Sequence, residues 1–354
     1  MLLYERIYNH LLARIRDGVL APGDRVPSEM ELAEQFDVSR ITSKKALELL
    51  RQHGLIERVR GKGSFVSQAL PAQTAPAVPP RQATALGLII PDLSEVYGLE
   101  LLCAIEERCA DLDLHLVIRR TRGQQEHEER AIASLVDSGL VDGLIIFPVN
   151  GEYYNATLLR IILDAYPLVL VDRHLSGIPA SAVSTDNVAA AAALTGYLLD
   201  LGHTDIAFVS PAPEHTASIE ARIEGFRAAF AVRDLAHNPR QLLTDLRCTL
   251  PDGFTSAEVD RDVERIAAYV AGESSVSAFV ASEYNLARVL RRATDKPIVC
   301  FDSPPDPVYG PLFPHIRQDQ RGMGTRSVDL LLAQLAGEAI PKQTTVPFSL
   351  VIPD

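Results

Sequence analysis

The chain has 354 residues, a formal net charge of −12, no tryptophan and four cysteines. This length is too great for one small domain and predicts two or more units. The sequence shows no signal-peptide pattern, and its longest apolar runs are the size of strands, so we expect a cytoplasmic protein without a membrane span. The cysteines form no CxxC pair, which favours buried free thiols, and we expect neither a metal site nor a cofactor.

The charge is distributed unevenly along the chain. Residues 1–68 hold eleven Lys/Arg against nine Asp/Glu, a net charge of +2, whereas the remaining residues have a net charge of −14. Within the first part, the segment 39–62 holds seven basic and two acidic side chains. The acidic part would repel a polyanion, so any contact with nucleic acid should be confined to this small basic region.

The first predicted element is an amphipathic helix over 4–17, because Ile7, Leu11 and Ile15 recur at every fourth position. A second, short helix is predicted between Pro27 and Phe36, with Ser28 as its cap.

Residues 37–38 break the helical pattern, and Ser39 then caps a third helix that runs from Arg40 to His53 and is stopped by Gly54. Two helices joined by so short a break must cross, which is the helix-turn-helix arrangement.

The third helix carries two different faces. Ala46, Leu49 and Leu50 form the apolar face, while Arg40 and Lys44 lie one turn apart on the other. The two short strand-like runs that follow, within residues 55–66, flank a turn at 61–63 and predict a hairpin with a basic tip. Basic side chains on a helix start and on a hairpin are what a phosphate backbone attracts, although a merely solvated face remains the alternative.

Residues 4–66 resemble the winged helix-turn-helix domain of the GntR family of bacterial transcription regulators. The marks are Gly23-Asp24-Arg25-Val26-Pro27-Ser28-Glu29, Val38-Ser39-Arg40-Ile41-Thr42, Ala46-Leu47-Glu48-Leu49-Leu50 and Gly61-Lys62-Gly63-Ser64-Phe65-Val66. The resemblance implies contact with double-stranded operator DNA through the recognition helix and the wing. Many family members have Arg at the position of Met30, and this chain would lack that phosphate contact. The implied DNA-binding residues are Arg25, Ser28, Glu29, Ser39, Arg40, Thr42, Ser43, Lys44, Arg60, Gly61, Lys62 and Gly63.

Residues 69–84 contain four prolines and little that could build a core, so we expect an extended linker between domains at 1–68 and 85–354. From residue 85 onward, short apolar runs alternate with helical segments, which predicts an α/β domain with parallel sheets covered on both faces. Its 270 residues favour two lobes. The predicted strands are 85–90, 115–118, 143–147, 168–171, 206–209, 278–281 and 298–301; the predicted helices are 99–111, 125–138, 156–165, 187–201, 220–232, 258–271, 285–292 and 322–336.

Ligands of parallel sheets bind beyond the carboxyl ends of the strands. Those ends carry a second resemblance, to the effector-binding domain of LacI-type repressors, which is similar to periplasmic sugar-binding proteins. The marks include Leu86-Gly87-Leu88-Ile89-Ile90-Pro91-Asp92, Val183-Ser184-Thr185-Asp186-Asn187 and Val299-Cys300-Phe301-Asp302. The chain departs from the family at Ser282-Glu283, where Asn-Asp is usual, and at Ser303-Pro304-Pro305. The resemblance implies an effector site made of Ser94, Tyr97, Asp172, Arg222, Ser282, Asp302 and Gln320.

Chemistry alone leaves other interpretations of these residues open. Arg222 and Asp302 could grip vicinal hydroxyl groups, or they could form a structural ion pair. Tyr97 could stack on a sugar face, or it could be an ordinary half-buried aromatic residue.

A GntR-type head before a LacI-type body also resembles the arabinose-responsive repressors of some Gram-positive bacteria, with the proline-rich segment in place of the LacI hinge helix. The expected function is therefore a homodimeric, ligand-controlled repressor that binds operator DNA and senses a sugar or polyol, with a nucleoside as the second choice. An enzyme on a doubly wound fold is the alternative, but the strand at 85–90 is not followed by GxGxxG and no GxSxG is present. A sugar sensor whose head binds another protein is the third hypothesis.

Overall fold

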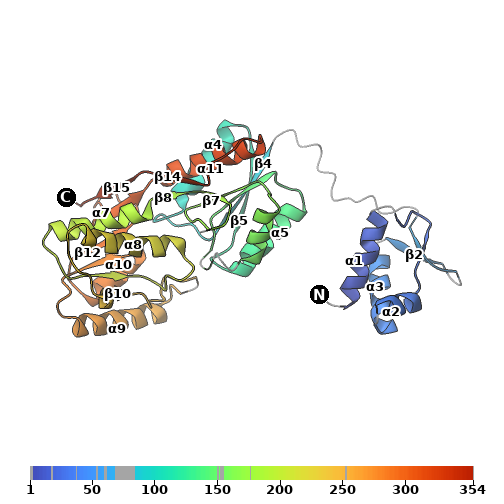
Figure 1. Ribbon diagram of the computed structural model, residues 1–354, viewed down its shortest axis with the longest axis horizontal. Helices are drawn as coiled ribbons and strands as arrows, with labels where there is room; N and C mark the ends of the chain where they lie inside the picture. Colours follow the sequence, from blue (N-terminus) through green and yellow to red (C-terminus); the bar gives the residue numbers. More distant parts are fainter. Residues whose placement is uncertain are drawn as a thin grey trace. The chain divides into compact units, whose positions relative to one another are not determined.

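A computed structural model describes residues 3–16, 19–36, 38–52, 55–59, 62–67, 84–149, 151, 155–175, 177–251 and 253–353. The chain forms two compact units, Met1–Arg81 and Gln82–Asp354 (Figure 1). All of the predicted linker except Thr84, together with Arg60 and Gly61 of the predicted wing tip, lies outside the described residues. No helix in the described ranges is long and apolar enough to cross a membrane.

The first unit, here called the head, is a helix-turn-helix with a small antiparallel sheet in the order β1-β3-β2. The predicted helical spacing is confirmed, since Ile7, Leu11 and Ile15 pack in one core with Leu32 and Leu50. The first strand is only two residues long and was not predicted. The elements are α1 (Leu3–Arg16), β1 (Arg25–Val26), α2 (Glu29–Phe36), α3 (Arg40–Gln52), β2 (Ile56–Val59) and β3 (Gly63–Val66).

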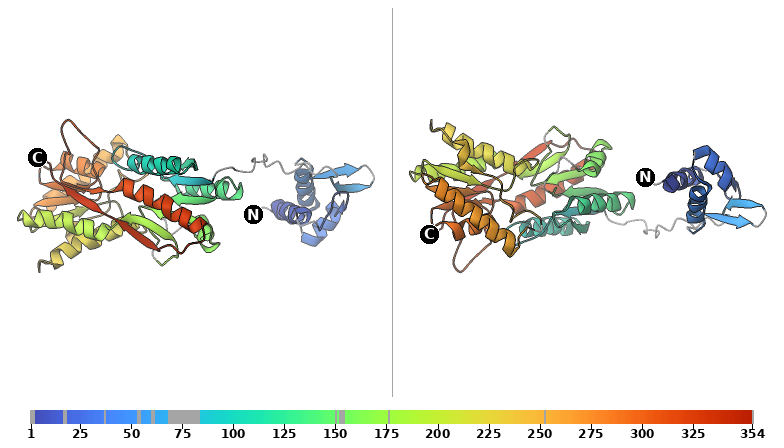
Figure 2. Two further views of the ribbon diagram at one scale, coloured as in Figure 1. Left: turned by 90° about the horizontal axis from the view of Figure 1, so that it is seen from above. Right: turned by 90° about the horizontal axis from the view of Figure 1, so that it is seen from below.

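The second unit has two lobes, each built on a six-stranded sheet with helices on both faces (Figure 2). In lobe 1 the sheet order is β14-β8-β7-β6-β4-β5 and every pairing is parallel. One face packs on α4 and α11, the other on α5 and α6. The elements of lobe 1 are β4 (Ala85–Ile90), α4 (Leu99–Asp111), β5 (His115–Arg120), α5 (Gln125–Asp137), β6 (Gly143–Ile146), α6 (Ala156–Leu163), β7 (Leu168–Val171), β8 (Ser181–Thr185), α11 (Gln320–Leu335) and β14 (Gln343–Val346).

Lobe 2 has the sheet order β10-β9-β11-β12-β13-β15, in which only β15 is antiparallel to its neighbour. Helices α7 and α8 cover one face, and α9 and α10 cover the other (Figure 1). The elements are α7 (Asn187–Asp200), β9 (Ile206–Val209), α8 (Ala217–Ala231), β10 (Leu242–Leu243), α9 (Ser256–Gly272), β11 (Ala278–Ala281), α10 (Tyr284–Ala293), β12 (Ile298–Phe301), β13 (His315–Gln318) and β15 (Phe348–Val351), with a short 3-10 helix at Pro239–Gln241.

The chain passes between the lobes at residues 185–187, 318–320 and 346–348, because the elements on either side of these points belong to different sheets. These passages lie directly after strands, so they adjoin the strand ends where a ligand is expected. The predicted strands and helices of this unit are confirmed. The strands β8, β10, β13, β14 and β15 were missed, because short or polar runs such as Gln343–Val346 give no apolar signal.

Candidate nucleic-acid interface and effector cleft

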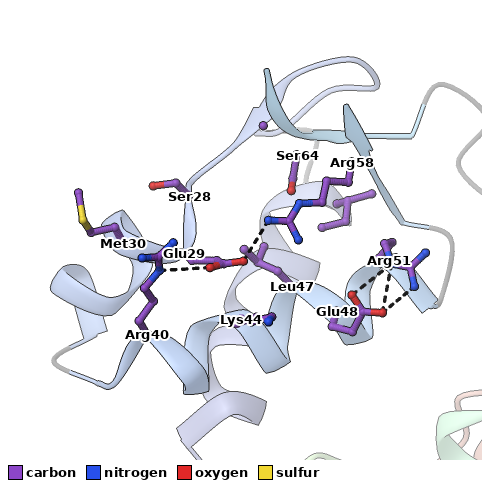
Figure 3. Close-up of a pocket in the computed structure, with 12 residues that line it drawn as sticks. Ser28, Glu29, Met30, Arg40, Lys44, Leu47, Glu48, Arg51, Arg58 and Ser64 are labelled. Carbon is purple, nitrogen blue, oxygen red and sulfur yellow. Dashed lines mark hydrogen bonds and ion pairs between the residues drawn. The ribbon is translucent and has the colours of Figure 1, made fainter. Parts of the chain in front are cut away.

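The carboxylate of Glu29 binds two of the basic side chains of the head, Arg40 and Arg58. Glu29, at the start of α2, accepts the Arg40 Nε–H at 3.3 Å on one oxygen and the Arg58 Nη2–H at 3.3 Å on the other (Figure 3). The Glu29 side chain is 15% exposed, whereas Arg40 and Arg58 are 71% and 63% exposed. Exposed ion pairs contribute little to stability. Their consequence here is geometric, because Glu29 orients two guanidinium groups that stay open to solvent.

Ser28 and Ser39 begin the two crossing helices. The Glu31 N–H donates to Ser28 Oγ at 3.2 Å, and Glu31 Oε2 accepts the Ser28 N–H at 2.6 Å, which is a capping box. This backbone hydrogen bond lowers the pKa of Glu31. At the next helix, Ser39 Oγ accepts the Thr42 N–H at 3.3 Å and lies 2.9 Å from Thr42 Oγ1. The sequence-predicted caps are therefore present, and their hydroxyl groups are already engaged within the head.

Ser43, one of the DNA-binding residues that the resemblance implies, does not lie on the exposed surface of the head. Its side chain is fully buried, and its hydroxyl donates to the Glu29 carbonyl at 2.7 Å. It therefore packs α3 against α2. Helical spacing explains this position, because Ser43 is three residues before the buried Ala46 and lies on the same face of α3.

A groove of about 270 Å³ opens between α2, α3 and the wing strands (Figure 3). Arg40, Lys44, Arg51 and Arg58 line it together with Glu29 and Glu48, and the Arg51 guanidinium binds Glu48 at 2.6 Å. Among the other predicted residues, Lys62 is exposed at the hairpin turn, Gly63 lines the groove and Arg25 is exposed on β1. The sequence analysis missed Arg58; its signal was the alternation along β2, which places Arg58 on the same side of the strand as Ile56, and both line the groove.

The second candidate site lies where the strand ends of the two lobes meet. A cleft of about 220 Å³ is bounded by residues that directly follow β6, β7, β11 and β12. It brings together all of the predicted effector residues except Ser94 and Gln320. Its lining is Val96, Tyr97, Phe147, Asp172, Arg173, Pro211, Ser218, Ile219, Arg222, Thr249, Ser282, Glu283, Asp302 and Gln318.

Arg222, on α8, is buried and held on three sides. Its Nε–H donates to Asn187 Oδ1 at 2.8 Å, its Nη1–H donates to the Ser282 carbonyl at 2.6 Å, and its guanidinium carbon lies 3.8 Å from the centre of the Phe301 ring. Gly225, one turn further along α8, permits this position, because a Cβ there would lie 2.1 Å from the Val188 carbonyl oxygen of α7. The remaining N–H groups of Arg222 can donate to a ligand in the cleft.

Asp172 and Asp302 occupy equivalent positions in the two lobes. Each is the first residue after a strand, each is buried, and each has a positive φ, 70° and 60° respectively. Asp tolerates this left-handed conformation better than most residues, and such backbone outliers cluster at binding sites. Asp302 Oδ2 accepts the Gln318 Nε2–H at 2.8 Å. Burial raises the pKa of Asp302 to about 7, against the opposing effect of Arg222.

Of the remaining predicted residues, Tyr97 lines the cleft. The Tyr97 hydroxyl donates to Asp172 Oδ1, and its ring packs edge-on against Phe147. Ser94 and Gln320 do not line this cleft. Ser94 Oγ accepts the Tyr97 N–H at 3.2 Å and lies in an adjoining cavity of about 570 Å³ that Tyr97 also lines. Gln320 Oε1 accepts the Gly98 N–H at 2.8 Å.

Several residues that line the cleft or hold its side chains were absent from the predicted site. Arg173 follows Asp172, donates to the Pro148 carbonyl at 3.0 Å and lies over the Phe147 ring. Asn187 and Gln318 stand at the passages between the lobes and hold Arg222 and Asp302. Glu283 lies beside Ser282. The sequence signal for Arg173 and Glu283 was their place at strand ends, whereas nothing local marked Asn187 and Gln318 as partners of distant side chains.

Different parts of the chain match different protein families. Residues 3–66 match the family described as bacterial regulatory proteins, gntR family. Residues 83–245 match periplasmic binding proteins and sugar binding domain of LacI family, and residues 195–353 match a periplasmic binding protein-like domain.

Two similar proteins are both named arabinose metabolism transcriptional repressor. The one from Halalkalibacterium halodurans is 25% identical over 244 residues, which is 68% of this chain and 64% of that protein. The one from Geobacillus stearothermophilus is 25% identical over 207 residues, which is 58% of this chain and 55% of that protein. The matched part thus spans less than two thirds of each relative.

Among solved structures, the transcription regulator CcpA of Lactococcus lactis has a TM-score of 0.64 at 17% identity over 77% of this chain and 98% of that structure, which shows a shared fold. The predicted fold class, a winged helix-turn-helix followed by a two-lobed α/β domain, is confirmed. The chain therefore carries a GntR-family helix-turn-helix domain at its N-terminal end and LacI-type periplasmic-binding-protein-like domains behind it.

Proposed function

We propose that this protein is a transcription regulator that binds operator DNA through the head and represses genes of sugar or polyol metabolism. In this proposal a small molecule in the cleft controls the affinity for DNA. The observation that carries the proposal is the presence, on one chain, of an ordered set of exposed guanidinium groups around Glu29 and a buried, charged cleft at the strand ends. The names of the similar proteins support the same function.

The head carries side chains suited to the two kinds of contact in DNA recognition, those to base edges and those to phosphates. Arg40 and Lys44 stand on the exposed face of α3, the helix that would enter the major groove. Arg58 on the wing and Arg40 on the helix converge on Glu29, so they are presented together. Guanidinium groups fixed in this way suit phosphate oxygens or guanine edges, which accept two hydrogen bonds side by side.

The cleft supplies the control. Arg222 and Asp302 come from lobe 2 and Asp172 from lobe 1, so one ligand could contact both lobes and stabilise a closed arrangement. The names of the relatives suggest a pentose as the first ligand to test. We further propose a homodimer, in which lobe closure turns the interface and alters the spacing of two heads on a near-palindromic site.

The test is selection of duplexes from a random DNA library by the full chain. We expect enrichment of a two-part, near-palindromic sequence, bound with a Kd on the order of 10⁻⁸–10⁻¹¹ M at physiological salt. Arg40→Ala should lose this enrichment while its ligand-induced change in melting temperature stays that of wild type. Lys45→Ala, which removes an exposed charge from the residue next to Lys44, is the matched control.

A second measurement adds L-arabinose and other sugars and polyols to the complex of protein and selected duplex. A change in Kd with one of them supports control through the cleft. Absence of any selected sequence with the wild-type chain would contradict the DNA-binding proposal. Selection with unchanged Kd under every small molecule would leave a DNA-binding protein without effector control.

A further inference from the structure

The cleft gathers buried polar atoms that have no hydrogen-bond partner within the described part of the chain. These atoms are Arg173 Nε, Thr249 Oγ1, Ser282 Oγ, Glu283 Oε1 and Gln318 Oε1, and all five residues line the cleft. Ser282 and Gln318 are each only 2% exposed. Native proteins rarely leave such atoms unpaired, because each costs the free energy of its lost hydration. Their concentration at one place indicates that a ligand supplies the missing partners.

The chemistry of the unpaired atoms restricts that ligand. Gln318 Oε1 is only an acceptor, and the amide nitrogen of the same side chain already donates to Asp302. Glu283 Oε1 is also an acceptor when the carboxylate is ionised. The hydroxyl groups of Ser282 and Thr249 can accept or donate. A ligand that fills this region must therefore donate hydrogen bonds to Gln318 and Glu283, whereas Arg173 Nε, a donor that lies 3.7 Å from Asp172 Oδ2, needs an acceptor.

The charged side chains of the cleft disfavour an anionic ligand. Its lining holds three carboxylates, Asp172, Glu283 and Asp302, against the two guanidinium groups of Arg173 and Arg222. Arg222 already donates to Asn187 and to the Ser282 carbonyl, and Arg173 to the Pro148 carbonyl. When all three carboxylates are ionised, an additional buried anion would find negative charge in excess, and its desolvation would be poorly compensated.

Among the three cleft carboxylates, Glu283 is the one at which this chain departs from the LacI-type pattern, in which Asp is usual at this position. Its carboxylate shares the cleft with that of Asp302, and burial raises the pKa of Glu283 to about 7 although Arg222 lowers it. The nearby Thr249 hydroxyl also lowers this pKa, but Thr249 Oγ1 and Glu283 Oε1 do not reach the geometry of a hydrogen bond. A donor from the ligand would stabilise the ionised form of Glu283, whereas a second anion would oppose it.

We propose that Glu283 is a specificity-determining residue whose Oε1 accepts a hydrogen bond from a hydroxyl or ammonium group of the effector and disfavours sugar acids and sugar phosphates. Thr249 and Ser282 complete this end of the cleft, while Arg222 and Asp302 bind the rest of the ligand. The inference rests on the proposed function, because it concerns the ligand of that same cleft.

The experiment compares the full-length wild type with Glu283→Gln, which keeps the shape of the side chain and removes its charge. The probes are matched pentose and hexose series, each with the free sugar, its polyol, its 2-amino derivative, its aldonic acid and its phosphate ester. Binding is measured by thermal shift and then by calorimetry. Glu338→Gln, at an exposed position outside the cleft, is the control for loss of one negative charge.

We expect wild type to bind a neutral or amino member about tenfold or more tightly than the corresponding acid or phosphate, which is the size of a charged hydrogen bond. Glu283→Gln should reduce this preference by about tenfold, and Glu338→Gln should keep it. Selective loss of the amino sugar in Glu283→Gln identifies an ammonium contact, and equal loss of sugar and amino sugar identifies a hydroxyl contact.

Two results would overturn the inference and leave the proposed function intact. One is tighter binding of an acid or phosphate than of the matched sugar by wild type. The other is an unchanged preference in a Glu283→Gln protein that is folded, as shown by a cooperative thermal transition without ligand. If wild type selects operator DNA but binds no member of either series, both the effector proposal and this inference fail.

Discussion

At the scale of single residues, the two sites use carboxylates in different ways. Glu29 lies at the surface of the head and keeps two exposed arginines together. Asp302 lies inside the second unit, where burial outweighs the attraction of Arg222 and raises its pKa to about 7. The surroundings of the two carboxylates differ in their access to solvent. Water screens the charges around Glu29, whereas desolvation disfavours the ionised form of Asp302.

The raised pKa of Asp302 makes a prediction for stability. Since the folded state holds this proton up to about pH 7 while the unfolded chain releases it near the ordinary value of 3.8, the contribution of Asp302 to the free energy of unfolding is fully present below that ordinary value. It is lost as the pH rises through the folded-state pKa.

We expect Asp302→Asn to gain stability relative to wild type as the pH rises from about 4 to about 7, and to keep that advantage above pH 7, because the amide never has to ionise. Thermal midpoints of both full-length proteins at several pH values check this. Tyr97, Asp172, Arg222 and Gln318 surround Asp302 and are unchanged in both proteins. A difference in midpoint that does not vary with pH would contradict the assigned shift.

At the scale of elements, the start of α3 decides how the head presents its charges. Ser39 caps this helix, and the residues that face the groove, Arg40 and Lys44, lie in its first two turns. Fraying of the first turn would therefore displace the side chains proposed to read DNA. The buried Ser43 fixes the same turn against α2 through its hydrogen bond to the Glu29 carbonyl.

Substitutions at Ser39 can separate capping from direct contact with DNA. Ser39→Ala should destabilise the head by about 1 kcal/mol and weaken operator binding, because an N-terminal cap is lost. Ser39→Asp should keep the stability of the head, since Asp also caps, and should still weaken DNA binding by placing a negative charge at the phosphate-facing end. Helix content on heating and duplex affinity are the measurements. Equal stability of all three proteins would show that this cap is not needed.

At the scale of the whole molecule, the proposed control depends on the passages between the lobes. Asn187 and Gln318 stand at two of these passages and hydrogen-bond Arg222 and Asp302. The residues that would bind a ligand are thus joined to the segments about which the lobes would turn.

The acidic charge of residues 69–354 also has a consequence at this scale, because it leaves the head as the region that can attract DNA.

The salt dependence of DNA binding tests whether the contacts with DNA are confined to the head. Every phosphate that the protein neutralises adds about 0.9 to the magnitude of the slope of log K against log salt concentration. Lys44→Gln should therefore lower that magnitude by about 1 and weaken binding to all sequences, if Lys44 binds a phosphate. Arg227→Gln, at an exposed position of lobe 2, should leave the slope unchanged. An equal effect of both substitutions would place DNA contacts outside the head.

Patterns along the sequence were sufficient for the helices and for the most apolar strands, but they did not reveal the short or polar strands β1, β8, β10, β13, β14 and β15. Helical spacing placed Ile7, Leu11 and Ile15 in a core, and buried apolar runs such as Leu168–Val171 indicated the parallel strands, because both patterns depend on residues close together in the chain. The same patterns pointed to Asp172 and Asp302, since residues after parallel strands meet at one edge of a sheet.

The choice of partners among the side chains was made by the three-dimensional fold. It placed Glu29 beneath Arg40 and Arg58, buried Ser43, and joined Arg222 to Asn187 across 35 positions of the chain. The unpaired atoms of Ser282, Glu283 and Gln318 likewise became visible only once their strands had been brought together. The physical reason is that solvation and hydrogen bonding depend on the whole surroundings of an atom, and residues far apart in the sequence make up those surroundings.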